Sequence, residues 1–265
     1  MNALILKHAF KQSLRPLIFL SLATCAFFYF AVWSSASFMS QVGDVPIFRN
    51  PPEVFRAMLG SADFLSPNGW IAIGLGHPLI LAMFSAAALG MASSAVAEEV
   101  ERGTVDLVLT REVTRNSLLA AKAIAASTVL TIVQASGLLG AILASATIED
   151  ASGINVAGAA RGFLGSWILF SAFLLIALLI SAASSLKSRA LGISVGLLVG
   201  SFFVNVVALL VDEVHALRYL SLFHYVRADD LIAGEGLSSV AVPAVIGIVA
   251  GALAFVIFNR RDIVR

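Results

Sequence analysis

Charged residues and cysteine are both scarce in this chain, and each shortage excludes a class of protein. Only 12% of the 265 residues are charged, 59% are hydrophobic and the mean hydropathy is +0.96, whereas an ordinary soluble domain is about 25% charged. A soluble fold cannot cover this much apolar surface, so we expect a bilayer to be the solvent. The single cysteine, Cys25, excludes an internal disulfide framework. A formal net charge of +1 leaves no basic footprint for nucleic acid.

The sequence also lacks the motifs of the common enzyme classes. It contains no G-x-x-x-x-G-K-[ST] phosphate loop, so it cannot bind and hydrolyse ATP by that route, and no C-x-x-C, H-E-x-x-H or G-x-S-x-G. Gly165-Ser166 could mimic the nucleophile of an intramembrane serine protease, but the last apolar segment has no histidine to activate it. His215 and His224 lie near Asp229 in a spacing that matches no metal-ligand motif. We therefore expect no catalytic residue, metal or cofactor in this chain.

Long apolar segments are what the chain does contain, and they predict a single-domain, all-α integral membrane protein. Six segments are expected to span the membrane, at about residues 17–39, 70–97, 118–147, 156–184, 190–211 and 240–258. Each is near or above the roughly 20 residues that a helix needs to cross a bilayer. The second segment contains His77-Pro78, which predicts a kink.

Residues 1–15 have the pattern of a short amphipathic helix. Lys7, Lys11 and Arg15 recur every four residues, and leucine and phenylalanine recur on another face. We expect this helix to lie in the headgroup layer on the cytoplasmic side. The alternative is a simple positively charged flank.

The distribution of Lys and Arg predicts the orientation. With both termini inside, twelve of the seventeen Lys and Arg residues fall on the cytoplasmic side, as the positive-inside rule requires. We therefore expect a protein of the plasma (inner) membrane with both termini in the cytoplasm, and with residues 98–117 on the same side.

The predicted spans carry no Asp, Glu, Lys or Arg in their interiors. This argues against a carrier driven by protons or sodium. Glycines recur at four-residue spacing, which favours close helix contacts, and packing within the chain is the more common outcome. The spaced glycines are Gly158 and Gly162, Gly192, Gly196 and Gly200, and Gly247 and Gly251.

Residues 212–239 are too apolar for a free loop. We expect them to fold as short helices at the outer membrane surface, with Tyr219 and Tyr225 at the interface.

Residues 97–122 form the only long segment of mixed charge between two apolar segments. Gly103 can end the helix that continues from the second span, and Thr104 can cap a new one. In that new helix Val105, Val108 and Leu109 fall on one side, so it presents an apolar stripe that suits a groove in a partner protein.

Three glutamates lie just before this predicted docking helix. Glu98, Glu99 and Glu101 could hold a cation, but the better explanation is that they form the solvated end of the second span.

The same segment resembles the signature of type-2 ATP-binding-cassette (ABC) exporter permeases. The residues that carry the resemblance are Glu99-x-Glu101-Arg102-Gly103-Thr104, then Asp106-Leu107-Val108-Leu109, Val113-Thr114-Arg115 and Lys122. Glu112 stands where the family commonly has proline. The resemblance covers the whole chain, including the six spans, the folded outer segment and the ending Phe258-Asn259-Arg260-Arg261-Asp262.

The resemblance implies a mechanism and a set of partners. Two permease copies form a homodimer or heterodimer in membrane lipid, and two separate cytoplasmic ATPase subunits bind ATP and Mg. The short helix between spans two and three is the coupling helix that docks on the ATPase, and substrate leaves along a dimer interface lined mainly by spans one and five. The implied docking residues are Glu99, Glu101, Arg102, Gly103, Thr104, Val105, Val108, Leu109 and Arg115. The implied pathway or interface residues are Phe27, Phe28, Phe30, Gly192, Gly196, Gly200, Phe202, Phe203 and Asn205.

The function expected from these features is that of the permease of an ATP-driven exporter, which has no ATPase motif of its own. The phenylalanines and the uncharged spans favour an apolar or amphipathic cargo. The alternative is a non-transporting membrane scaffold or sensor that regulates a partner ATPase.

Overall fold

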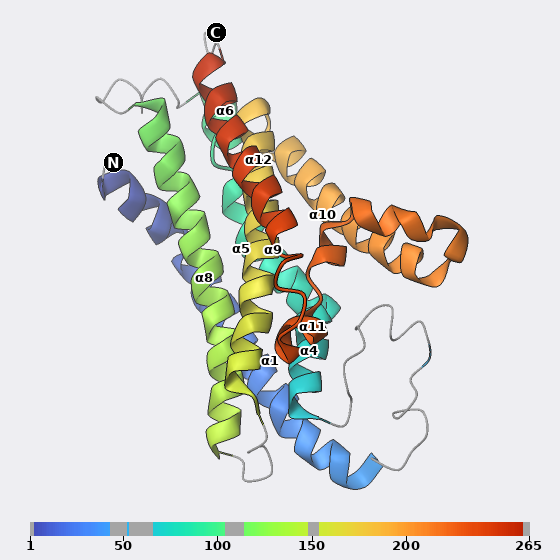
Figure 1. The fold of residues 1–265 in the computed structure, drawn as a ribbon. Coiled ribbons are helices and arrows are strands. Elements are labelled where there is room, and N and C mark those ends of the chain that lie inside the picture. The colour runs from blue at the N-terminus through green and yellow to red at the C-terminus, as the bar shows by residue number, and fades with distance from the viewer. Residues whose placement is uncertain (1–2, 43–51, 53–65, 104–113, 148–153, 262–265) are drawn as a thin grey trace.

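The computed structural model is a bundle of long helices with both termini and α6 at one end (Figure 1). It describes residues 3–42, 52, 66–103, 114–147 and 154–261, with the side chains of residues 13–35 within the first helix. No strand occurs among these residues. Five helices are long and apolar enough to cross a membrane, and a bent pair brings the number to six.

The helices follow the predicted spans to within a few residues, except at the N-terminal end of the first. They are α1 (Ala3–Val42), α4 (Pro67–Gly76), α5 (Pro78–Ala92), α6 (Ala97–Glu101), α8 (Arg115–Thr147), α9 (Val156–Ala183), α10 (Lys187–Leu210), η2 (Asp212–Leu220), η3 (Leu222–Tyr225), α11 (Ala228–Ala233) and α12 (Ala241–Arg260). The short elements η2, η3 and α11 lie where the sequence predicted folded outer helices.

The N-terminal boundary differs from the prediction. The separate amphipathic helix expected over residues 1–15 is instead the first part of α1, which runs without a break through Pro16. Residues 3–15 contain no glycine and are rich in good helix formers. A single proline removes one hydrogen bond and can bend a helix without ending it.

The second span is bent as predicted. Helices α4 and α5 meet at an angle of 55°. Pro78 is the first residue of α5, and Nδ1 of His77 accepts a hydrogen bond from the Leu79 amide at 3.2 Å. Proline suits this first position because its missing N–H would have no partner inside the helix.

Close helix contacts define the core, which is centred on α9. This helix packs against α5, α8, α10, α11 and α12. A β-carbon at Gly140 of α8 would lie 2.1 Å from the carbonyl oxygen of Cys25 on α1. One at Gly247 of α12 would lie 2.9 Å from the α-carbon of Ala172 on α9. Glycine at these two positions lets the backbones approach, as it commonly does in membrane helices.

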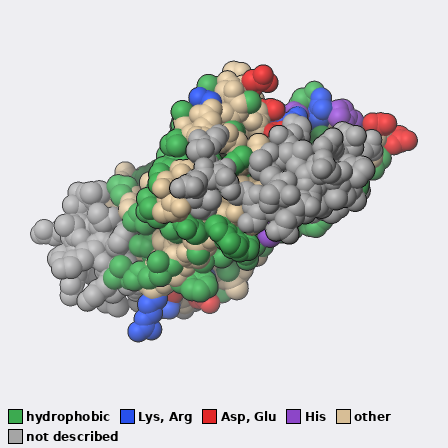
Figure 2. All heavy atoms as spheres, turned by 90° about the horizontal axis from the view of Figure 1, so that it is seen from below, with side chains coloured by type: hydrophobic (Ala, Val, Ile, Leu, Met, Phe, Trp, Pro, Cys, Tyr) green, Lys and Arg blue, Asp and Glu red, His purple; other side chains and the backbone are tan. Residues whose placement is uncertain are grey.

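The outer helices close one side of the bundle. Arg161 of α9 donates hydrogen bonds from Nε to the carbonyl of Leu231 and from Nη2 to that of Ile232, both at 3.0 Å, and so binds the end of α11. Seen from the end opposite the termini, hydrophobic side chains make up much of the described surface (Figure 2).

Helix α10 stands apart from the rest of the bundle (Figure 1). Only four of its 24 residues are buried: Ala190, Ser194, Leu198 and Ala208. A β-carbon at Gly192, Gly196 or Gly200 would have no described residue within 4 Å, outside its own neighbours and helix backbone. The expectation of packing within the chain is therefore wrong for these three glycines, although it holds for those of α9 and α12, which contact Ile232 and Leu175.

Candidate functional site at the polar end of the bundle

A buried serine fixes the start of α6. The Oγ of Ser181, on α9, accepts hydrogen bonds from the backbone amides of Val96 and Ala97 at 3.0 and 3.1 Å. Ser181 is fully buried, and α6 has no N-terminal cap from its own sequence. Because the first amides of a helix have no partner inside it, α9 supplies the cap that the local sequence lacks.

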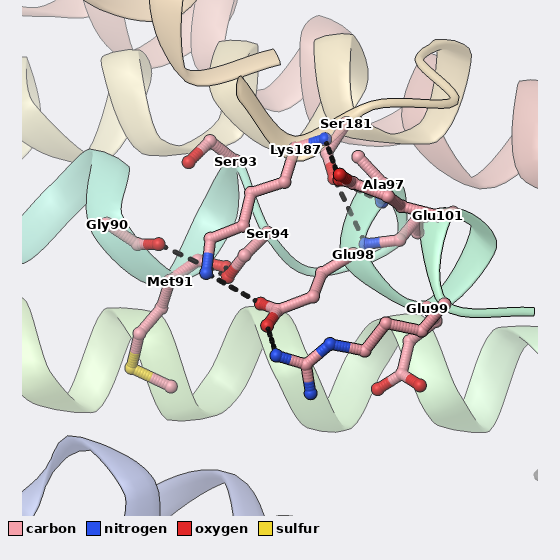
Figure 3. Close-up of polar contacts among 12 residues, drawn as sticks. Gly90, Met91, Ser93, Ser94, Ala97, Glu98, Glu99, Glu101, Ser181 and Lys187 are labelled. Atoms are coloured by element: carbon pink, nitrogen blue, oxygen red, sulfur yellow. Dashed lines mark hydrogen bonds and ion pairs between the residues drawn. The ribbon is translucent and has the colours of Figure 1, made fainter. Parts of the chain in front are cut away.

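Glu98 connects α6 to the start of α10. Its Oε2 lies 2.9 Å from Nζ of Lys187, the first residue of α10, and its Oε1 pairs with Arg102 (Figure 3). The Glu98 side chain is only 23% exposed, so this pairing is more protected from solvent than an ordinary surface ion pair.

Glu101 makes a second connection to α10. Its Oε2 accepts a hydrogen bond from the backbone amide of Lys187 at 2.8 Å. The residue before the helix, Leu186, provides no side-chain cap. A carboxylate at this position satisfies an unpaired amide and opposes the positive end of the helix dipole.

Glu99 connects α6 to α8. Its Oε1 lies 2.9 Å from Nζ of Lys122, and the two side chains are 23% and 20% exposed. Glu98 and Glu99 are thus each paired with a cation of another helix, and their interpretation as a solvated helix end is wrong. No cluster of three or more His, Cys, Asp or Glu able to hold a metal occurs in the described ranges.

Gly103 ends α6 as predicted. Its φ of +65° lies in the left-handed region, which favours glycine at the residue after a helix end. Thr104, Val105, Val108 and Leu109 lie outside the described residues, so their role in docking stays a prediction.

Arg115 anchors the chain where α8 begins. Its Nη1 donates hydrogen bonds to the carbonyls of Phe258, Asn259 and Arg261 at 3.1, 3.3 and 2.7 Å. These carbonyls lie at the end of α12, where the helix dipole favours a cation. Nδ2 of Asn259 also donates to Oδ1 of Asn116 at 2.6 Å.

Arg261 extends this anchor to α9. Its Nη1 donates to the carbonyls of Ala182 and Ser184 at 2.9 and 2.8 Å, and its Nη2 donates to Oγ of Ser185 at 2.7 Å. Sequence reasoning missed the roles of Arg261, Ser181 and Lys187. The only signal for Arg261 was a basic residue just beyond a predicted helix end.

The structure separates the implied pathway residues into three groups. Phe28 is fully buried, with its ring 4.8 Å from that of Phe163, and Phe27 packs on it. Phe30 and Phe203 are 61% and 58% exposed. The three glycines of α10 are exposed as well. Phe202 packs against Phe223, and Asn205 lines a cavity.

These features define a multi-pass helical membrane protein with a polar network at one end of its bundle. Within that class the chain belongs to the ABC-2 family of transporter proteins, because residues 3–263 match that family. No curated protein matches the chain. The resemblance to type-2 ABC permeases is therefore confirmed. Proteins of this family are the membrane components of ABC transporters, normally work with ABC ATPase subunits and are generally not catalytic themselves.

Proposed function

We propose that this chain is the permease subunit of an ABC exporter and that residues 98–117 receive the force of ATP hydrolysis from a separate ATPase. The observation that carries the proposal is the anchoring on both sides of residues 104–113. On one side α6 binds α8, α9 and α10 through Glu99, Ser181 and Glu98. On the other side Arg115 binds the end of α12. A displacement of the segment between them would reach four spans at once.

The anchors are strong enough to transmit force. A hydrogen bond to a charged group contributes about 1.5–3 kcal/mol, and the two flanks hold several of them. The contacts to Lys187 engage both its side chain and its backbone, so α10 would follow α6. We infer that α10 is the span that moves most, because few of its residues are buried in the bundle.

The exposed glycine face of α10 supports a dimeric complex. Gly192, Gly196 and Gly200 are separated by about one helical turn each, and a β-carbon at any of them would meet none of the described residues within 4 Å. Such faces allow a second helix to approach closely. We propose that two permease copies meet along α10 and α1 and that two ATPase subunits, holding ATP and Mg, bind at the end that carries both termini. That end would be cytoplasmic in the inner membrane.

Co-purification tests the docking step. Val108→Asp with Leu109→Asp places two charges on the proposed apolar stripe, and we expect the complex with its ABC ATPase to be lost. Thr114→Asp is the matched control, because it adds a carboxylate nearby while aspartate can still cap the amide that Thr114 now caps. A complex that survives the double change would overturn the docking claim.

Transport activity separates the exporter from a scaffold or sensor. The complex is reconstituted in vesicles, and ATPase stimulation and substrate movement are measured over a panel of apolar and amphipathic compounds. ATP-dependent export of any compound supports the permease. Binding of the ATPase without movement of any compound supports the scaffold instead.

A further inference from the structure

A cavity of about 500 Å³ lies within the protomer, between α4, α5, α9 and α10 on one side and the outer elements η2, η3 and α11 on the other. Its volume falls in the range of roughly 300–1,000 Å³ that holds drug-sized ligands. None of the residues of the polar network described above lines this cavity. At the edge of the face in Figure 2 where the outer helices lie, basic, acidic and histidine side chains gather.

The part of the cavity formed by the long helices is mostly apolar, with Ser166 of α9 and Asn205 of α10 as its polar residues. Leu75 of α4, Leu169 and Phe170 of α9, and Phe202 and Leu209 of α10 contribute to it. Such a wall suits an aliphatic or aromatic tail, whose removal from water is favourable by about 25 cal/mol per Å².

The part formed by the outer elements is polar and carries both charge signs. Arg227 is already compensated, because it pairs with Asp229 at 3.1 Å and with Asp230 at 3.3 Å. Arg218 differs, since none of the described residues forms an ion pair with it. Its Nη2 donates to the hydroxyl of Tyr219 at 2.9 Å, and its guanidinium lies 4.9 Å from that ring.

Three buried polar atoms at the cavity lack a hydrogen-bond partner in the part of the chain that the structure describes. They are Nε of Arg218, Oδ1 of Asn205 and Oγ of Ser166. Leaving a buried donor or acceptor unsatisfied costs about 1–3 kcal/mol, and more for a charged group. Buried polar atoms are therefore normally satisfied by protein, water or ligand. Their position around one cavity indicates a ligand that supplies an acceptor to Arg218.

The carboxylates near the cavity do not cancel this preference. Asp229 is engaged by Arg227. Asp212 is exposed and precedes Arg218 by six residues on a 3-10 helix, which corresponds to about 12 Å along the axis. That is the rise between the two backbone positions, and no ion pair joins the two side chains in the described part of the chain. Arg218 is thus the one cation at the cavity that lacks a counterion among the described residues.

We propose that this cavity binds a single-chain amphiphile with an acidic head, a phosphate ester or a carboxylate, whose head pairs with Arg218 and whose tail lies between α9 and α10. Asn205 and Ser166 bind polar atoms near the head. The proposal does not rest on ATPase docking, so it can be tested on the permease alone.

Binding to the purified full-length protein tests the proposal. The protein is placed in nanodiscs of zwitterionic phosphatidylcholine, and empty nanodiscs correct for partition of the probes. The probes share one tail: dodecyl phosphate, dodecanoate and dodecanol. We expect saturable binding of one or both acids, at least tenfold tighter than that of dodecanol. Binding of only the phosphate or only the carboxylate would identify the head. Equal binding of all three probes, or no saturable binding, would overturn the proposal.

Two variants locate the site. Arg218→Gln should weaken binding of the acids at least tenfold and leave dodecanol unchanged. Arg189→Gln, an exposed arginine at the other end of α10, is the matched control and should change nothing. Ser166→Leu fills the cavity without changing charge and should weaken binding of every probe, so it provides the test if Arg218→Gln does not fold. Acid binding that survives both Arg218→Gln and Ser166→Leu would place the ligand elsewhere and refute the site.

Discussion

Ser181 offers the sharpest test of how α6 is held. In the Ser181→Ala variant, the amides of Val96 and Ala97 lose the oxygen that accepts their hydrogen bonds at 3.0 and 3.1 Å. All three residues are at most 1% exposed, so water has no ready access to replace it. Each unsatisfied buried amide costs about 1–3 kcal/mol. The expected destabilisation for the two amides is therefore about 2–6 kcal/mol, a large share of a typical stability of about 5–15 kcal/mol.

The Ser181→Ala variant distinguishes two roles of this region: holding α6 in place and docking on a partner. The substitution leaves residues 104–113 unchanged, so co-purification with an ABC ATPase should persist. Because the start of α6 is no longer fixed to α9, we expect substrate-stimulated ATPase activity of the complex to fall several-fold while basal activity changes little.

The assay combines thermal melting of the purified permease with ATPase measurements on the reconstituted complex. Ser188→Ala is the matched control, since Ser188 is exposed and lies seven residues further along; it should leave both readouts unchanged. A Ser181→Ala protein with an unchanged melting temperature would mean that the two amides find other acceptors, and the assignment of Ser181 as the cap of α6 would then be refuted.

Three further perturbations test other features. Gly103→Ala forces an L side chain into a φ of +65°, at a cost of about 1–2 kcal/mol, and should lower the melting temperature; no change would show that the end of α6 relaxes freely. Burial first, and then the two nearby arginines, hold the pKa of His224 below its usual value, so stability should fall as pH drops below about 6.5. In His224→Gln this loss of stability should be smaller. Asp230, whose pKa is raised by burial and by a neighbouring carboxylate, is present in both proteins and cannot account for the difference. Identical pH profiles of stability would contradict the assignment of the pH dependence to His224. In a Cys25→Ser background, Gly196→Cys should form an oxidation-dependent dimer on a non-reducing gel if α10 meets a second copy, and a monomer would count against that interface.

The spans were predictable because their cause is local. Each is a continuous apolar run of sufficient length, and no distant residue changes that requirement. The bend at His77-Pro78 and the end of α6 at Gly103 were predictable for the same reason, since proline and glycine act on their own backbone. The end of the N-terminal helix was not, because α1 continues through Pro16.

The partners of the charges could not be predicted. Glu98 and Lys187 are 89 residues apart, and their meeting depends on how α6, α9 and α10 pack. Ser181 looks in the sequence like any serine in an apolar span. The glycines of α10 have the same spacing as those of α12, yet only the latter are covered within the chain. Spacing gives the face of a helix but does not say what lies against it.

The two sites meet in α10. Its first residue, Lys187, is held by Glu98 and Glu101 at the polar end, and Phe202 and Asn205 line the cavity on the same helix. A helix of 24 residues is about 36 Å long, and its rigidity carries a rotation at one end to the other. Because only four of its residues are buried, rotating α10 costs less core packing than moving α9 would. If the proposed ATPase docks beside α6, a displacement of α6 would change the wall of the cavity, and a ligand in the cavity would in turn shift Lys187.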